Sequence, residues 1–151
     1  MEGVGPRSQT EQTGLSIMTE ATQFCVALEN KPGTLAALCH VLRRADVDVQ
    51  ALFVSNDEEF CWVNMVAVPM DAVERMLCDG GYHFFTEKVL TVRTQNRPGA
   101  LEAVAARLAD NGVNINYVYG SSMDASEFTL VLNVSDHDAA VRTLGADRQT
   151  V

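Results

Sequence analysis

An internal repeat at a fixed offset is the feature that most constrains how this chain can fold. The residues Asn-Lys-Pro-Gly at 30–33 recur as Asn-Arg-Pro-Gly at 96–99. A leucine and an amphipathic segment follow each copy, and then come Val-Asp-Val at 47–49 and Val-Asn-Ile at 113–115. Every match keeps the offset of 66 residues that separates position 30 from position 96, without a gap. Repetition of this kind indicates a duplicated structural module, so we expect two copies of one small fold.

The hydrophobic periodicity of the first copy predicts the order strand, helix, strand, strand, helix, strand. Apolar residues alternate through 22–28, which is typical of a strand with one buried face. After the turn they recur at steps of three and four, as in a helix packed on a sheet, at Leu35, Leu38, Cys39 and Leu42. We also expect strands at 49–55, 61–68 and 82–87, and a short helix that begins at Asp71 and ends at Gly80-Gly81.

The second copy repeats this order. The expected elements are strands at 89–94, 115–119 and 128–134 and helices at 101–110 and 139–144, with a last strand cut short by the end of the chain at Val151. Right-handed crossovers would place both helices of each copy on one face of a four-stranded antiparallel sheet. The sequence therefore predicts an α+β fold of two tandem ferredoxin-like βαββαβ sandwiches: a flexible leader at 1–21, one domain at 22–87 and a second at 88–151.

A module of this size is expected to need further packing against another module or chain to be stable. A chain of about 65 residues buries only ~60% of its unfolded surface, which leaves it marginally stable. We also expect apolar side chains on the sheet face away from the helices, at Leu52, Val54, Val118 and Val131. Self-association, most simply as a homodimer, is therefore expected.

The net charge and the cysteines limit which partners and which cellular compartment we expect. A net charge of −9 disfavours nucleic acid and anionic membranes as partners, because both carry negative charge. No apolar stretch is long enough to span a bilayer, and the leader lacks the basic start and apolar block of a secretory signal. The sequence leaves open whether the natural start is Met1 or Met18. Four widely spaced cysteines in apolar runs indicate reduced core residues of a cytoplasmic protein: Cys25, Cys39, Cys61 and Cys78.

The repeated loop offers the groups that a free amino acid requires. The start of a helix stabilises a carboxylate, because its backbone N–H groups lack partners and the helix dipole is positive there. Pro98 suits the first helical turn since it has no N–H, and Gly99 leaves the backbone open to a ligand. Asn96 carries both a donor and an acceptor. We expect Asn114, at the head of the following strand, to lie beside this loop.

These residues resemble the ACT domain. The resemblance rests on the run from Asn96 through Pro98-Gly99-Ala100-Leu101 and on Gly112-Val113-Asn114-Ile115, and it covers the chain from about Thr22 to the C-terminus. It implies a tandem ACT protein without catalytic machinery, metal or cofactor. ACT modules bind amino acids or related metabolites at module interfaces, pair through their sheets or helices, and commonly regulate metabolic enzymes.

The resemblance also implies particular site residues. In the ACT domain of phosphoglycerate dehydrogenase, which binds serine, asparagines at two motif positions contact the ligand, and Asn96 and Asn114 match both. The implied site of the second copy is Thr94, Asn96, Arg97, Pro98, Gly99, Asn114 and Ile115. Thr94 replaces a histidine of that enzyme, so serine itself is not implied. The first copy matches in part, with Asn30 and Gly33 present but Asp48 in place of the second asparagine. We therefore favour the second copy.

Several alternatives remain at this stage. Asn30 and Asn96 are also favoured residues for capping a helix, and Asn114 is a common turn residue. A second hypothesis is a regulatory subunit of a separate amino-acid-biosynthesis enzyme, similar to the small subunit of acetolactate synthase. A third is an enzyme on the same fold, such as an acylphosphatase. That reaction needs an arginine-bearing phosphate cradle, and no Gly-rich cradle accompanies Lys31 or Arg97. The three histidines form no catalytic pattern with serine or cysteine.

Overall fold

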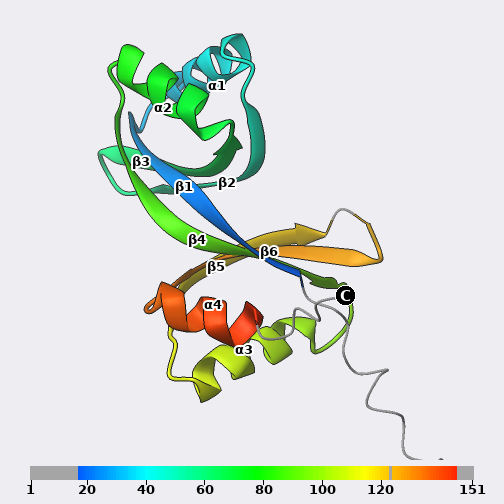
Figure 1. Cartoon of the computed structure of the whole chain (residues 1–151). Helices are drawn as coiled ribbons and strands as arrows, with labels where there is room; N and C mark the ends of the chain where they lie inside the picture. Colours follow the sequence, from blue (N-terminus) through cyan, green and yellow to red (C-terminus); the bar gives the residue numbers. More distant parts are fainter. Residues whose placement is uncertain (1–16, 123, 146–151) are drawn as a thin grey trace, which may run out of the picture. The chain divides into compact units, whose positions relative to one another are not determined.

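The computed structural model describes residues 17–122 and 124–145 (Figure 1). The element order confirms the predicted tandem α+β fold. In chain order the elements are β1 (Ile17–Glu29), α1 (Thr34–Arg44), β2 (Asp48–Asn56), β3 (Phe60–Val68), α2 (Met70–Asp79), β4 (His83–Gln95), α3 (Ala100–Asp110), β5 (Ile115–Ser122), β6 (Glu127–Val134) and α4 (His137–Gly145). The strands follow the order β2-β3-β1-β4-β6-β5, and every pair with a described register is antiparallel.

The chain divides into two compact units. The N-terminal unit is Ala21–Val89, and the C-terminal unit joins the chain from Leu90 onward with the chain up to Glu20. The long strands β1 and β4 contribute to both units. The N-terminal unit therefore has the strand order β2-β3-β1-β4, and the C-terminal unit has β1-β4-β6-β5.

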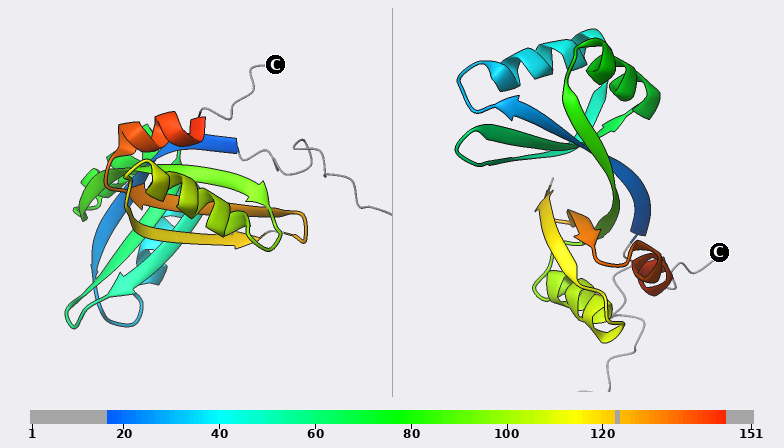
Figure 2. Two further views of the ribbon diagram at one scale, coloured as in Figure 1. Left: turned by 90° about the horizontal axis from the view of Figure 1, so that it is seen from below. Right: turned by 90° about the vertical axis from the view of Figure 1, so that its left-hand side faces the viewer.

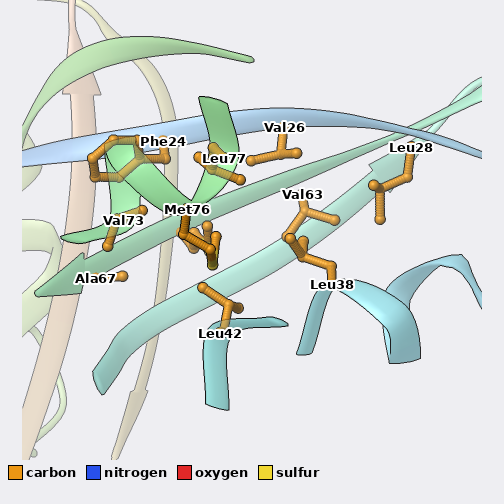
Figure 3. Close-up of a cluster of buried hydrophobic side chains, with 11 residues drawn as sticks. Phe24, Val26, Leu28, Leu38, Leu42, Val63, Ala67, Val73, Met76 and Leu77 are labelled. Carbon is orange, nitrogen blue, oxygen red and sulfur yellow. The ribbon is translucent and has the colours of Figure 1, made fainter. Parts of the chain in front are cut away.

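In the N-terminal unit, α1 and α2 cover one face of the sheet (Figures 1 and 2). Leu38 and Leu42 of α1 belong to the same buried cluster as Val63 of β3 (Figure 3). The complete buried cluster is Phe24, Val26, Leu28, Leu38, Leu42, Val63, Met65, Ala67, Val73, Met76 and Leu77. Alternation along the strands directs these residues toward the helices.

The C-terminal unit repeats this construction, with α3 and α4 on one side of its strands (Figures 1 and 2). Its core contains Met18, Leu90, Val92, Val104, Leu108, Val113, Leu130, Leu132, Ala140 and Leu144. Met18 comes from the start of β1 and is only 3% exposed. The Thr91 hydroxyl donates to the Thr19 carbonyl, and His137 of α4 contacts the carboxylate of Glu20 at 2.8 Å.

The start of β1 differs from the sequence prediction. Residues 17–21 were expected in a flexible leader, but they are strand, and Met18 belongs to a core. The strand that we expected after 139–144 would fall on residues 146–151, which lie outside the described part of the chain, as do residues 1–16 of the leader. The beginning of β1 supplies a strand to the C-terminal unit.

The register corrects the predicted sheet faces. Leu52 lies opposite Met65, Val54 opposite Val63, and Val118 opposite Leu132. Residues directly opposite one another share a face, so these three point toward the helices. Of the four residues expected on the other face, only Val131 lies there. Both faces of these strands carry apolar residues, and a shift of one position exchanges the faces, which is why the sequence prediction was wrong.

Two of the four cysteines differ from the expectation that all four lie in a core. Cys25 is buried and its pKa is raised, chiefly because burial disfavours the thiolate. Cys39 and Cys78 are exposed, because they lie beside the buried stripes of α1 and α2 rather than in them. Across the described residues, no group of His, Cys, Asp and Glu is placed to hold a metal ion, and no helix is long and apolar enough to cross a membrane.

Candidate functional site

The loop between β4 and α3 owes its shape to Gly99. This residue is the N-cap of α3 and has a φ of 86°, a left-handed conformation that glycine adopts without strain. Gly33 holds the same position before α1, with a φ of 91°. Neither helix has a side-chain hydrogen bond at its cap. The interpretation of Asn30 and Asn96 as helix caps is therefore wrong.

The two asparagines instead tie their loops to the neighbouring hairpin of the same unit. The Asn96 backbone N–H donates to the Ser126 carbonyl at 3.0 Å, and its Nδ2 donates to the Asp124 carbonyl at 3.5 Å. Asn30 does the same, with distances of 3.1 Å to Glu59 O and 3.3 Å to Asp57 O. Each asparagine thus fixes where its loop sits above the sheet.

An aspartate organises each of these hairpins. Asp124 accepts hydrogen bonds from the hydroxyl and backbone N–H of Ser126 and from the backbone N–H of Glu127. The Ser126 hydroxyl, followed by the two backbone groups, holds the pKa of Asp124 below its ordinary value. Asp57 makes the matching bonds to the backbone of Glu59 and Phe60. The predicted strands at 49–55 and 61–68 leave a short connection between them, but the aspartates were not assigned this role from the sequence. An aspartate in a short polar connection between two strands was the available signal, because Asp side chains bond the backbone in turns.

The loop before α1 and the loop before α3 differ in the hydrogen bonds that their polar side chains make. In the N-terminal unit, the Asn30 amide oxygen accepts a hydrogen bond from the Cys61 thiol. The Thr34 hydroxyl contacts the Glu29 and Lys31 carbonyls, and the Lys31 ammonium lies 2.6 Å from the Glu29 carboxylate.

The thiol and hydroxyl contacts have no counterpart in the C-terminal loop. Ala100 takes the position of Thr34 and has no hydroxyl. Phe128, opposite Thr94, takes the position of Cys61, which lies opposite Leu28 in the N-terminal unit. The Asn96 amide oxygen has no hydrogen-bond partner among residues 17–122 and 124–145. Asn96, Arg97, Pro98 and Gly99 are all exposed, while Thr94 is buried on β4 with 6% exposure. The Asn96 amide oxygen therefore differs from that of Asn30, which accepts a hydrogen bond from the Cys61 thiol.

Asn114 does not lie beside this loop, contrary to the sequence prediction. Asn96 bonds at the start of β6 through Ser126, whereas the Asn114 backbone N–H donates to Ser135 Oγ, just past the end of β6. β6 has eight residues, and at about 3.3 Å per residue it separates the two asparagines by roughly 23 Å. The reason is topological: α3 returns along the sheet, so β5 begins at the opposite end from the loop that precedes α3.

The surroundings of Asn114 form a short polar ladder. Its Nδ2 donates to Asn116 Oδ1 at 3.2 Å, and Asn116 Nδ2 donates to Asn133 Oδ1 at 2.8 Å. Ile115 follows as the first residue of β5, opposite Val134. In the N-terminal unit, Asp48 occupies the matching far end, opposite Val68. Each unit thus carries the predicted residues as two half-sites, one at either end of its sheet.

Two shallow grooves lie away from these half-sites, at matching places in the two units. One, of about 460 Å³, runs between α1 and α2 and is lined by Arg44 and Arg75. The other, of about 370 Å³, runs between α3 and α4 and is lined by Arg107 and Arg142. No predicted site residue lines either groove. Each groove lies between the two helices of its unit, so both follow from the repeated fold.

A family model for the ACT domain pair matches residues 18–144. The chain belongs to this family. The match begins at the buried start of β1 and ends in α4, so it covers both units. ACT domains are regulatory modules, which agrees with the paired loops described above.

Solved structures show the same ACT pair fold. Protein BT0572 from Bacteroides thetaiotaomicron is 25% identical, with a TM-score of 0.81 over 87% of this chain and 90% of that one. The regulatory subunit of aspartate kinase from Thermus thermophilus is 12% identical, with a TM-score of 0.57 over 87% and 95% of the two chains. The corresponding subunit from Thermus flavus is 14% identical, with a TM-score of 0.57 over 89% and 97%. The search of curated proteins finds no match.

Proposed function

We propose that this ACT domain pair is a regulatory protein that binds a free amino acid and has no catalytic activity of its own. The observation that carries the proposal is the C-terminal loop. Its helix begins without a side-chain hydrogen bond at the cap, and its residues 96–99 are exposed. The hairpin holds Asn96 in place, and the Asn96 amide oxygen accepts no hydrogen bond from the residues that the structure describes. A carboxylate suits the helix start, and the asparagine oxygen suits an ammonium.

A second copy of the chain would complete the site. One unit cannot bring Asn96 and Asn114 to a single small ligand, because they lie at opposite ends of β6. β5 is an edge strand whose sequence, Ile-Asn-Tyr-Val-Tyr-Gly-Ser-Ser, contains neither charge nor proline. Edge strands without such protection tend to pair. Antiparallel pairing of two β5 strands would bring the partner's Asn114 to the end where Asn96 lies.

A regulatory subunit that serves a separate enzyme of amino-acid biosynthesis is the second candidate. The Thermus aspartate kinase regulatory subunits have nearly the same extent as this chain, since 95% and 97% of their lengths are covered. A free-standing ACT pair of this size therefore has precedent as a subunit. An arrangement like the acetolactate synthase small subunit fits less well, because here the second half repeats the first. The two candidates are compatible: the amino acid would be the signal and the enzyme its recipient.

Thermal-shift measurements with the twenty amino acids, followed by calorimetry on the best ligand, test amino-acid binding. We expect Asn96→Ala and Asn114→Ala each to abolish binding, while Asn30→Ala leaves it within about twofold. An absence of stabilisation by every amino acid would overturn the proposal.

Mixing the two inactive variants tests the shared site. In a two-fold dimer, a hybrid of Asn96→Ala and Asn114→Ala chains contains one site with both asparagines intact. We expect the mixture, after dissociation and reassociation, to regain binding at up to one ligand per two hybrid chains. Retention of binding by a demonstrably monomeric protein would contradict the shared site but leave amino-acid binding in place.

A further inference from the structure

Three aromatic residues form an exposed patch on the N-terminal unit. Phe60 and Trp62 lie on β3 and Phe85 lies on β4; we refer to these three as the aromatic patch. Phe60 is 43% exposed and Phe85 is 48% exposed. On β3 they alternate with Cys61 and Val63, which pack in the core under the helices. Phe60 and Trp62 therefore occupy the sheet face that the helices do not cover.

The rings meet across an intervening strand. β1 lies between β3 and β4, yet the Trp62 and Phe85 rings approach to a centroid distance of 5.6 Å at an interplanar angle of 59°. Ala27 is the β1 residue directly opposite Trp62. Its small side chain lets the larger rings meet above it. The half-buried Trp62 ring and the exposed Phe85 ring therefore contact each other, and Phe60 lies two residues before Trp62 on the same face of β3.

The repeat provides an internal control for this patch. In the C-terminal unit, Arg93 pairs with Thr129 as Ala27 pairs with Trp62, and Glu127 takes the position of Phe60. Arg93 and Glu127 lie 3.8 Å apart as an exposed ion pair. The same fold is thus built with polar residues at these positions. Folding does not require aromatic residues there, which points to a binding role.

Acidic residues surround one side of the patch. The hairpin before Phe60 carries Asp57, Glu58 and Glu59, all exposed, and Glu29 lies directly opposite Phe60. We refer to these four as the acidic rim. Lys31 pairs with Glu29, but no basic residue accompanies the three in the hairpin. Aromatic residues within a charged rim are the usual composition of a protein-binding hot spot.

We propose that the aromatic patch and the acidic rim together dock a partner protein that presents apolar side chains bordered by lysine or arginine. The charge selects this occupant. A second copy docked through this same surface would bring another acidic rim, and nucleic acid would bring phosphates, so the acidic rim repels both. The surface is independent of the proposed amino-acid site, because none of its residues belongs to either half-site.

Trp62 is the only tryptophan of the chain and reports directly on this surface. The probe is a synthetic helical peptide of leucine and lysine without aromatic residues, and its matched control has glutamate in place of lysine. We expect the lysine peptide to shift Trp62 emission to shorter wavelength, and the effect to weaken as salt is added. The glutamate peptide should leave the emission unchanged.

Variants separate this surface from general peptide binding. The double variant Phe60→Ser with Phe85→Ser should bind the lysine peptide at least tenfold more weakly, whereas Met70→Ser, at an exposed apolar position on α2, should bind like the parent chain. The rim variant Glu58→Lys with Glu59→Lys tests the charge without altering the aromatic residues, and it should weaken the lysine peptide by a similar factor.

Three results would overturn the proposal. One is equal binding by the parent chain and both double variants, each checked for folding by circular dichroism. Another is loss of self-association in Phe60→Ser with Phe85→Ser, measured by sedimentation, which would assign the patch to a second copy. The third is a shift of Trp62 emission to shorter wavelength when single-stranded RNA is added without any peptide, which would assign the patch to nucleic acid.

Discussion

Gly99 holds a backbone conformation that residues with a side chain adopt only at a cost. A Cβ added there would meet no atom within 4 Å, so substitution would introduce backbone strain without a clash. We expect Gly99→Ala to lower the free energy of unfolding by about 1–2 kcal/mol, as is typical of a left-handed alanine. Urea denaturation followed by circular dichroism measures this. Ser121→Ala, at an exposed position, is the control and should change stability by less than about 0.5 kcal/mol.

Asp124 makes the second hairpin sensitive to acid. Its pKa is lowered in the folded protein, so the carboxylate stabilises the fold fully above the ordinary aspartate pKa of about 3.9. This contribution is lost as the pH falls through the lowered value. NMR titration of the Ser126 amide should follow this change, and Asp124→Asn should remove it. A Ser126 amide signal that titrates at the ordinary aspartate value would contradict the assignment.

At the residue scale, the sequence predicted the loop but not its partners. The Pro-Gly turn and its place before a helix could be read from 96–99 alone. The hydrogen bond from Asn96 to the Asp124 carbonyl could not, because it joins positions 28 residues apart whose approach depends on the pairing of β4 with β6. For the same reason, no local pattern distinguished a capping asparagine from an anchoring one.

At the scale of elements, the start of β1 supplies a testable contribution to the C-terminal unit. Met18 is buried in its core, whereas the neighbouring Ile17 is 55% exposed. We expect Met18→Ala to cost roughly 2–5 kcal/mol and Ile17→Ala to have little effect. Hydrogen exchange read by mass spectrometry should show faster exchange in α3 and α4 than in β3 for the Met18 variant. Equal protection in all three elements would contradict the assignment of Met18 to that core.

Helices and strands could be predicted where the hydrophobic periodicity lies within the element itself. The prediction was wrong where the structure depends on residues distant in sequence. Leu38 and Leu42 recur at helical spacing and are buried as expected, whereas Leu35 and Cys39 of the same predicted stripe are exposed. The five residues at 17–21 follow a polar segment, and nothing local shows that they extend a strand. The faces of β2 and β5 were assigned wrongly because both faces of these strands are apolar, so only the register could decide.

For the whole molecule, the repeat was enough to predict two units of one fold and their family. It was not enough to place the two halves of the candidate site. Whether Asn96 and Asn114 lie close together depends on where β5 begins relative to the loop before α3. Within one unit they lie at opposite ends of β6. The proposed site then depends on association, which makes the predicted hybrid of two inactive variants its most direct test.

The sharing of β1 between the units has a consequence for biosynthesis. Residues 17–20 leave the ribosome before the rest of the C-terminal unit, yet their neighbours in that unit are Leu90 and Val92 in β4 and His137 in α4. The nascent N-terminal segment must therefore wait for almost the whole chain before this unit can close. A gene cut between the two repeats would deprive the downstream product of a strand encoded at its far upstream end.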